Sequence, residues 1–121
     1  MSLAVAATVL SLLVLIAFLL SAFFAFDQLI RIEYEQHRDA WESDGKPVGF
    51  FWRAKECSLV GSGGARMWLT VYWLFQTPTW VATSPALQRK LRRLRLSLLV
   101  WNAGFITWFF VVRSFADVLR N

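Results

Sequence analysis

The feature that most constrains the fold of this chain is a dense basic cluster that runs directly into an apolar segment. Five of the seven residues from Arg89 to Arg95 are arginine or lysine, and no charged residue follows from Leu96 to Val112. The apolar segment has about 17 residues, roughly 25 Å as a helix, which is the lower end of a bilayer span. Arg95 and Arg113 can lengthen it by snorkelling outward. The pattern predicts a transmembrane helix over residues 96–113 that enters the bilayer from the cytoplasm.

The N-terminal part of the chain contains a second apolar segment. Leu3 to Phe26 carries no charged residue, and its roughly 36 Å of helix can cross a bilayer with some tilt. A cleaved signal peptide is the competing interpretation, but the segment lacks a basic start, has a long apolar core and ends without a small-x-small cleavage site. We therefore expect a retained transmembrane helix over residues 1–26.

The composition agrees with a membrane protein. Apolar residues make up 57% of the 121 residues and aromatic residues 17%, more than a soluble domain of this size can bury. The fold class predicted is an all-α membrane protein, with two transmembrane helices joined by a cytoplasmic segment that carries short amphipathic or interfacial helices. The net charge of +5 lies mostly beside an apolar span, so anionic lipid head groups are expected as partners and nucleic acid is not.

The distribution of lysine and arginine predicts the orientation. Eleven of the 13 lysines and arginines lie between the two apolar segments, two follow the second and none precedes the first. By the positive-inside rule, residues 27–95 are cytoplasmic, and both termini, including the tail 114–121, are not.

Residues 27–43 are expected to continue the first helix, because they include no proline or glycine. Ile30, Tyr34 and Trp41 then share one face of the helix, and the turn chemistry of Asp44 to Pro47 ends it. His37 is the only histidine, and a haem or metal site would normally need a second strong ligand, so a structural role is expected. Cys57 is the only cysteine and is expected to be a reduced thiol.

The middle of the cytoplasmic segment combines aromatic residues and glycines. The aromatic residues from Gly49 to Trp52 are expected either at the head-group level or against another chain. Ser58 to Gly64 is interpreted as a flexible loop, and not as a phosphate-binding loop, because no Gly-Lys-Ser/Thr follows. Met67 to Phe75 is uncharged but too short to span a bilayer. It predicts an interfacial helix over residues 66–76, with Trp68 and Trp73 at the membrane surface, and a re-entrant element as the alternative.

Ser84 and Pro85 predict the start of a basic helix over residues 85–95, with serine as the N-cap and proline at the first helical position. Leu87, Leu91, Leu94 and Leu98 share one face of it. The opposite face is expected to contact lipid head groups through Arg89, Lys90, Arg92, Arg93 and Arg95. Within the second span, Asn102 and Gly104 are predicted to pack against another helix, either the first span or a partner.

The order of these features resembles the universal stress protein B family of bacterial inner-membrane proteins. The matching elements are the N-terminal span, Asp44-Gly45 followed by Gly49-Phe50-Phe51, the aromatic helix Met67 to Phe75, the basic run and the C-terminal span. The chain departs from the family by its Gly-Ser-Gly-Gly loop and by the tail from Arg113 to Asn121. The resemblance implies an inner-membrane location and an association with the stress response, without known catalytic residues.

The residue pattern favours a non-enzymatic protein without cofactor or metal. The sequence shows no paired carboxylates in a span, no nucleophile with a base and no metal-ligand cluster. The function predicted is that of a small structural or regulatory membrane protein that acts by helix packing and by contacts with the membrane surface, with other membrane proteins or with itself. The alternative is an accessory subunit of a larger redox, photosynthetic or transport assembly.

Overall fold

The computed structural model describes residues 2–55, 57 and 59–121, the last range without the side chains of residues 59–61. The helices are α1 (Leu3–Gln36), α2 (Arg38–Ser43), α3 (Leu59–Phe75), α4 (Thr79–Ala82) and α5 (Pro85–Arg120). The described residues form no strand, so the prediction of an all-α fold is confirmed for them. By length and composition, α1 and α5 are apolar enough to cross a membrane.

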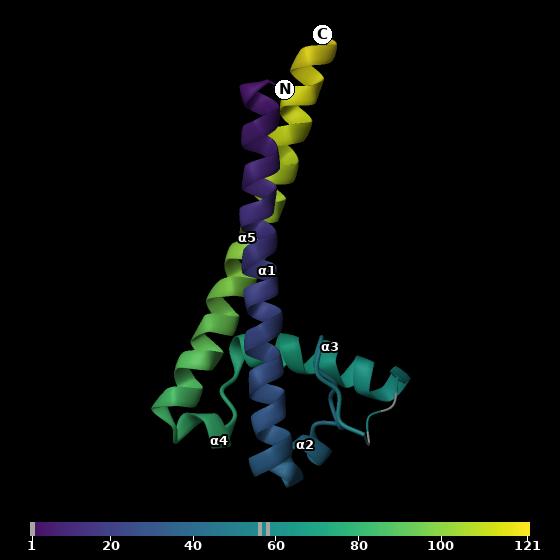
Figure 1. Ribbon diagram of the computed structural model, residues 1–121, viewed down its shortest axis with the longest axis vertical. Coiled ribbons are helices and arrows are strands. Elements are labelled where there is room, and N and C mark those ends of the chain that lie inside the picture. Colours follow the sequence, from purple (N-terminus) through teal and green to yellow (C-terminus); the bar gives the residue numbers. More distant parts are fainter. Residues whose placement is uncertain (1, 56, 58) are drawn as a thin grey trace.

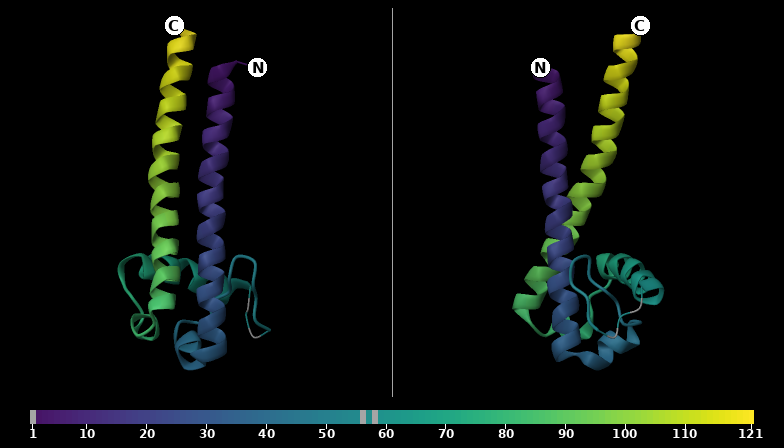
Figure 2. Two further views of the ribbon diagram at one scale, coloured as in Figure 1. Left: turned by 60° about the vertical axis from the view of Figure 1, so that its left-hand side comes forward. Right: turned by 45° about the vertical axis from the view of Figure 1, so that its right-hand side comes forward.

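Two long helices and a group of short elements make up the molecule. Figure 1 shows α1 and α5 running antiparallel, with both chain termini at one end and α2, α3 and α4 at the other. We call α2, α3, α4 and the loop 44–55 the collar. Helix α3 crosses the direction of the two long helices in both Figure 1 and Figure 2, and the right-hand view of Figure 2 shows the terminal halves of α1 and α5 diverging.

Helix α1 begins with a cap and continues well past its apolar segment. The Ser2 hydroxyl accepts a hydrogen bond from the Val5 amide at 3.2 Å, which satisfies one of the free amides at the helix start. The helix ends at Gln36, where His37 adopts φ −134°, and α2 follows at once. The predicted helix 27–43 is therefore present but is interrupted at His37. The shared face is confirmed, since Ile30 and Trp41 are buried and Tyr34 packs edge-on to Trp41.

The predicted turn after α2 is also confirmed. Gly45 has φ 91° and Lys46 has φ 54°, the left-handed conformation that glycine adopts without strain. The buried Trp41 indole then donates to the Pro47 carbonyl at 3.0 Å. This bond fixes the direction in which the chain leaves the turn.

The prediction of a flexible loop at Ser58 to Gly64 is wrong from Leu59 onward, and Ser58 lies outside the described residues. Helix α3 starts at Leu59 and includes all three glycines, so it is longer than the predicted helix 66–76 and ends at Phe75. Glycine costs roughly 1 kcal/mol per residue in a helix. Tertiary contacts along the helix oppose this cost, because Ser62, Leu69 and Trp73 are buried and the Ser62 carbonyl accepts from the Val48 amide at 3.4 Å.

Helix α5 runs without a break through the predicted basic helix, the predicted span and most of the tail. Its start is as predicted, with the Ser84 hydroxyl accepting from the Leu87 amide at 3.4 Å and Pro85 in the first turn. Its leucine face, Leu87, Leu91, Leu94 and Leu98, is buried.

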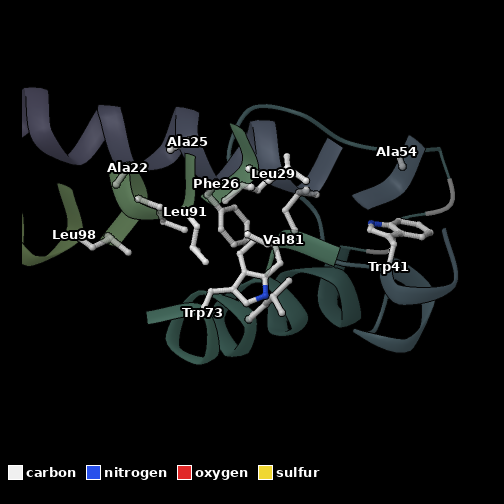
Figure 3. Packing of buried hydrophobic residues seen from close by; sticks show 14 of the residues in the cluster. Ala22, Ala25, Phe26, Leu29, Trp41, Ala54, Trp73, Val81, Leu91 and Leu98 are labelled. Atoms are coloured by element: carbon white, nitrogen blue, oxygen red, sulfur yellow. The ribbon is translucent and has the colours of Figure 1, made fainter. Parts of the chain in front are cut away.

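The hydrophobic core lies at the collar end. Figure 3 shows Phe26 of α1, Trp73 of α3, Val81 of α4 and Leu91 of α5 meeting there. The Trp73 ring lies 5.4 Å from the Phe26 ring and 6.0 Å from the Trp80 ring. Almost no residue in the most apolar stretches of α1 and α5 is buried inside the protein. The most hydrophobic surface of this chain therefore faces outward.

Candidate membrane-interface site

One residue of α3 marks the level at which the apolar segments of both long helices end. The Trp73 ring packs on Phe26, the last residue of the charge-free segment of α1. The Trp73 carbonyl accepts a hydrogen bond at 2.8 Å from Arg95, the last basic residue before the apolar segment of α5. Two boundaries far apart in the sequence thus lie at the same height, and α3 crosses the molecule there (Figure 1).

Arg95 caps the C-terminal end of α3. Besides the Trp73 carbonyl, its guanidinium donates to the Gln76 carbonyl at 2.9 Å and to the Thr77 hydroxyl at 3.1 Å. A cation at a helix C-terminus satisfies free carbonyls and interacts favourably with the helix dipole. Arg95 was predicted to contact lipid head groups, whereas the structure places its guanidinium on α3.

The face of α3 that points away from the core is apolar and aromatic. Its exposed side chains are 45% to 78% accessible and recur at helical spacing, namely Met67, Trp68, Val71, Tyr72 and Phe75. Such a face is costly in water and is typical of a helix that lies in a membrane interface or against another protein. Trp68 lies on this face. Trp73 does not, because it is only 1% exposed, and its predicted contact with the membrane surface is corrected to a place in the core.

The other basic residues of the cluster divide into two groups. Arg89 and Arg92 are exposed and Lys90 is half-buried. These three side chains therefore lie on the side of α5 that faces away from the core. Arg93 is exposed too, but its guanidinium donates to the Ser21 hydroxyl of α1 at 3.0 Å. Ser21 also lies 3.3 Å from the Ser97 hydroxyl. Arg93 therefore joins the two long helices instead of pointing freely outward.

We call residues 49–52 the aromatic loop. Asp27 anchors this loop to α1. Its carboxylate accepts the backbone amides of Phe50, Phe51 and Trp52 at 2.6, 2.7 and 3.0 Å. Gly49 permits this approach, because a Cβ at that position would lie 2.6 Å from Asp27 Oδ1. Hydrogen bonds from several amides to one carboxylate are strong, so the position of the loop on α1 is well determined.

The aromatic loop packs on its own chain. The Phe50 ring stacks on Phe23 at 3.9 Å and the Phe51 ring on Phe24 at 5.1 Å. The sequence left open whether these rings meet head groups or another chain. The structure adds a third partner, α1 itself, while Phe51 stays 61% exposed.

Glu33 is a buried carboxyl group that the sequence reasoning missed. It is fully buried, and neither carboxyl oxygen has a hydrogen-bond partner among the described residues. The pKa of Glu33 is raised to about 9, mainly by burial and also by the neighbouring Asp44, while Trp80 opposes the shift. His37 stacks on Trp80 at 5.1 Å. A signal existed, because Glu33 follows Phe26 and Ile30 at i+7 and i+3, which places it on the same helix face as these two apolar residues.

The two predicted packing residues of α5 lie on different faces. Gly104 faces α1, because a Cβ there would collide with the Leu15 side chain, and Trp108 donates to the Thr8 carbonyl at 3.3 Å. Asn102 is exposed, and its amide donates to the Leu98 carbonyl of its own helix at 2.7 Å. The close approach of α1 and α5 thus involves Gly104 and not Asn102.

The described residues form no group of three or more His, Cys, Asp or Glu side chains that could hold a metal ion. Cys57 is buried, with its sulfur 3.7 Å from the Lys46 carbonyl and 3.8 Å from the Pro47 carbonyl. The distinctive arrangement is therefore the apolar face of α3, the anchored loop and the outward-pointing arginines at one level. No family model, no curated protein and no solved structure matches this chain.

Proposed function

We propose that this chain is a small, non-enzymatic integral protein of the bacterial inner membrane, with α1 and α5 crossing the bilayer and the collar lying at its cytoplasmic surface. The observation that carries the proposal is the common level of Phe26, Trp73 and Arg95. A bilayer boundary at this height would place both apolar segments in hydrocarbon and α3 in the interface.

The polarity on either side of this level supports the proposal. On the terminal side, the long helices present apolar side chains outward, including Leu10, Leu13, Phe109 and Phe110, and hydrocarbon is the solvent that suits them. On the collar side, Arg89 and Arg92 are exposed where anionic head groups would attract them. The lysine and arginine distribution supports the same orientation.

Such a protein would act through contacts. The exposed face of α3 offers a contact surface at the membrane, and the family resemblance adds a role in the general stress response to the proposal. The alternative role, an accessory subunit of a larger membrane complex, is favoured by one observation. A groove of about 780 Å³ lies between the diverging halves of α1 and α5, and its lining includes the small residues Ala103 and Gly104. Small residues allow a third helix to approach closely.

Cysteine labelling tests the membrane arrangement. Native Cys57 is buried and is a poor reporter, so it is first replaced by alanine. Ala86→Cys and Ala116→Cys then form a matched pair, since both alanines are exposed on α5. In intact spheroplasts, a membrane-impermeant maleimide should label Ala116→Cys and should reach Ala86→Cys only after permeabilisation. The reverse pattern would contradict the orientation, and release of the protein by alkaline carbonate would contradict membrane integration.

Purification in mild detergent at native expression level separates the two roles. A protein that acts through lipid contacts and small partners should migrate alone or as a small oligomer. Co-migration with a large assembly would favour the accessory-subunit role. Ala103→Ile tests the groove, because Ala103 is exposed and lines it, and a large side chain there should abolish co-migration that depends on a third helix.

A further inference from the structure

A surface pocket in the collar has the character of an anion site. It measures about 340 Å³ and lies between the aromatic loop and the first turns of α3, where Phe51, Arg53, Gly63 and Arg66 contribute to its lining. Two arginines thus border one pocket from two different elements.

The charge of these arginines is not neutralised by ion pairs with the described residues. Among the described residues, neither Arg53 nor Arg66 forms a salt bridge with a carboxylate. The carboxylate of Asp27 in α1 also lies against the loop, but its two oxygens already accept three backbone amides. The charged residues that line the pocket are thus both arginines, Arg53 and Arg66.

Arg66 is held in position with donor capacity left over. Its guanidinium lies 4.7 Å from the centre of the Phe50 ring and donates weakly to the Gly49 carbonyl at 3.4 Å. Its Nε is buried and has no hydrogen-bond partner. Arg53 is exposed and uses one donor on the Cys57 carbonyl at 3.3 Å. A guanidinium offers five donors in a fork that matches phosphate oxygens, so both residues can donate to a further anion.

The pocket lies at the proposed head-group level. Phe50 and Phe51 stack on Phe23 and Phe24, close to the end of the apolar segment of α1. The exposed Phe51 ring borders the pocket on the apolar side. Gly63 of α3 lines the pocket, and a Cβ at this position would meet no atom within 4 Å.

We propose that this pocket binds the phosphate group of an anionic phospholipid, with Arg53 and Arg66 donating to the phosphate oxygens and Phe51 contacting the start of the acyl chains. The proposal rests on the proposed membrane location, and it adds a specific lipid site to it. The shared chemistry is a phosphate oxyanion, which free phosphate also offers.

Native mass spectrometry of the detergent-purified protein tests the site. The probes are short-chain phosphatidylglycerol and phosphatidylcholine with the same acyl chains. Gly63→Leu should fill the pocket, and Gly64→Leu is its control, because Gly64 has equal free space, the same helix and no place in the pocket lining. We expect the wild type and Gly64→Leu to retain phosphatidylglycerol over phosphatidylcholine, and Gly63→Leu to lose about tenfold in apparent affinity.

A second pair of variants removes a positive charge instead of filling the pocket with a side chain. Arg53→Gln should also weaken phosphatidylglycerol retention about tenfold, whereas the exposed Lys55→Gln carries the same charge change outside the pocket and should have little effect. Melting curves show whether each variant is folded. Because Arg53 is exposed, its replacement should leave the fold intact. The Arg53 variant therefore still tests the site if a side chain at Gly63 disturbs α3.

The outcomes separate the possible sources of the anion. Displacement of the lipid by millimolar inorganic phosphate would show that the phosphate group alone is recognised, and retention would show that the acyl chains contribute. Equal retention by Gly63→Leu and Gly64→Leu would overturn the site, and equal retention of phosphatidylcholine, which carries the same phosphodiester, would overturn its preference for an anionic lipid. Carbonate extraction distinguishes this failure from failure of the proposed function, because a protein that resists extraction and shows no lipid preference lacks only the site.

Discussion

The half of the molecule that holds the two chain termini and the half that holds the collar differ in how their polar side chains form hydrogen bonds. In the terminal half, hydroxyl side chains bond within their own helix, as Thr8 does to the Ala4 carbonyl at 2.8 Å and Thr107 to the Ala103 carbonyl at 2.9 Å, although the Trp108 indole reaches the Thr8 carbonyl of α1. In the collar half, Asp27 and Arg95 bond to other elements. Helices whose polar side chains form hydrogen bonds within the helix itself can face hydrocarbon. The shape of the collar instead depends on a few hydrogen bonds between residues far apart in the sequence.

The strongest test of this comparison is removal of the anchor of the aromatic loop. Asp27→Ala should lower the free energy of unfolding by about 4 kcal/mol, because three hydrogen bonds to a charged group are lost and the amides stay partly buried. Asp27→Asn should cost less, since one acceptor remains. Thermal melts in detergent measure both, with the exposed Asp117→Ala as control. An Asp27→Ala variant as stable as wild type would show that the loop does not need this anchor.

Glu33 should make the stability of the collar depend on pH. Its pKa is raised to about 9 in the folded chain from the ordinary value of 4.5, so the folded state holds the proton more tightly than the unfolded state. This contribution is fully present below about pH 4.5 and is lost as the pH rises toward about 9. Between pH 6 and pH 8, stability should fall by roughly 1.4 kcal/mol per pH unit.

Melting curves at several pH values check this dependence. The Glu33→Gln variant should lose most of the slope, because glutamine does not titrate. Glu35→Gln is a matched control on the exposed side of α1. A wild-type slope that Glu33→Gln leaves unchanged would place the titrating group elsewhere.

Two variants of the basic cluster that each remove one positive charge should differ in stability. Arg95→Gln should destabilise the protein by about 2 kcal/mol, because it removes the cap of α3 and leaves carbonyls unpaired. Arg92→Gln should change stability by less than about 0.5 kcal/mol, because Arg92 is exposed. Equal melting temperatures for the two variants would remove the distinction between a structural and an outward-facing arginine.

The contact between the long helices should tolerate no side chain at Gly104. Gly104→Ile is expected to cost about 2 kcal/mol, because its side chain would collide with Leu15 and force the helices apart. The control is Ala116→Ile on the exposed end of the same helix. A second change, Leu15→Ala, should restore part of the loss in Gly104→Ile. The absence of any rescue would indicate that Gly104 does not pack on α1 in the folded protein.

Asn102 should have the smallest effect. Since its amide bonds to its own helix and its side chain is exposed, Asn102→Leu should change stability by no more than about 0.5 kcal/mol, and leucine should favour insertion. Melting temperature and oligomeric state in detergent are the measurements. A clear loss of stability or of an oligomer in Asn102→Leu would mean that this residue contacts another chain.

The sequence was most informative where a property is local and periodic. The uncharged lengths of Leu3 to Phe26 and Leu96 to Val112 predicted two long apolar helices. Turn chemistry predicted the ends at Asp44 to Pro47 and at Ser84, since caps and left-handed turns depend on neighbouring residues only. The leucine stripe of α5 was predicted for the same reason, because helical spacing alone puts its members on one face.

The tertiary structure decided what depends on residues distant in the chain. The glycines of α3 are helical although their propensity is low, and the helix that contains them buries Ser62, Leu69 and Trp73 against the rest of the chain. Trp68 and Trp73 are alike in the sequence, but only Trp73 meets Phe26, and Arg95 differs from Arg92 only by the carbonyls within its reach. Composition and periodicity determined which segments are apolar and helical. Which side chains are buried, capped or left exposed was decided by packing, because a contact energy exists only once both partners are in place.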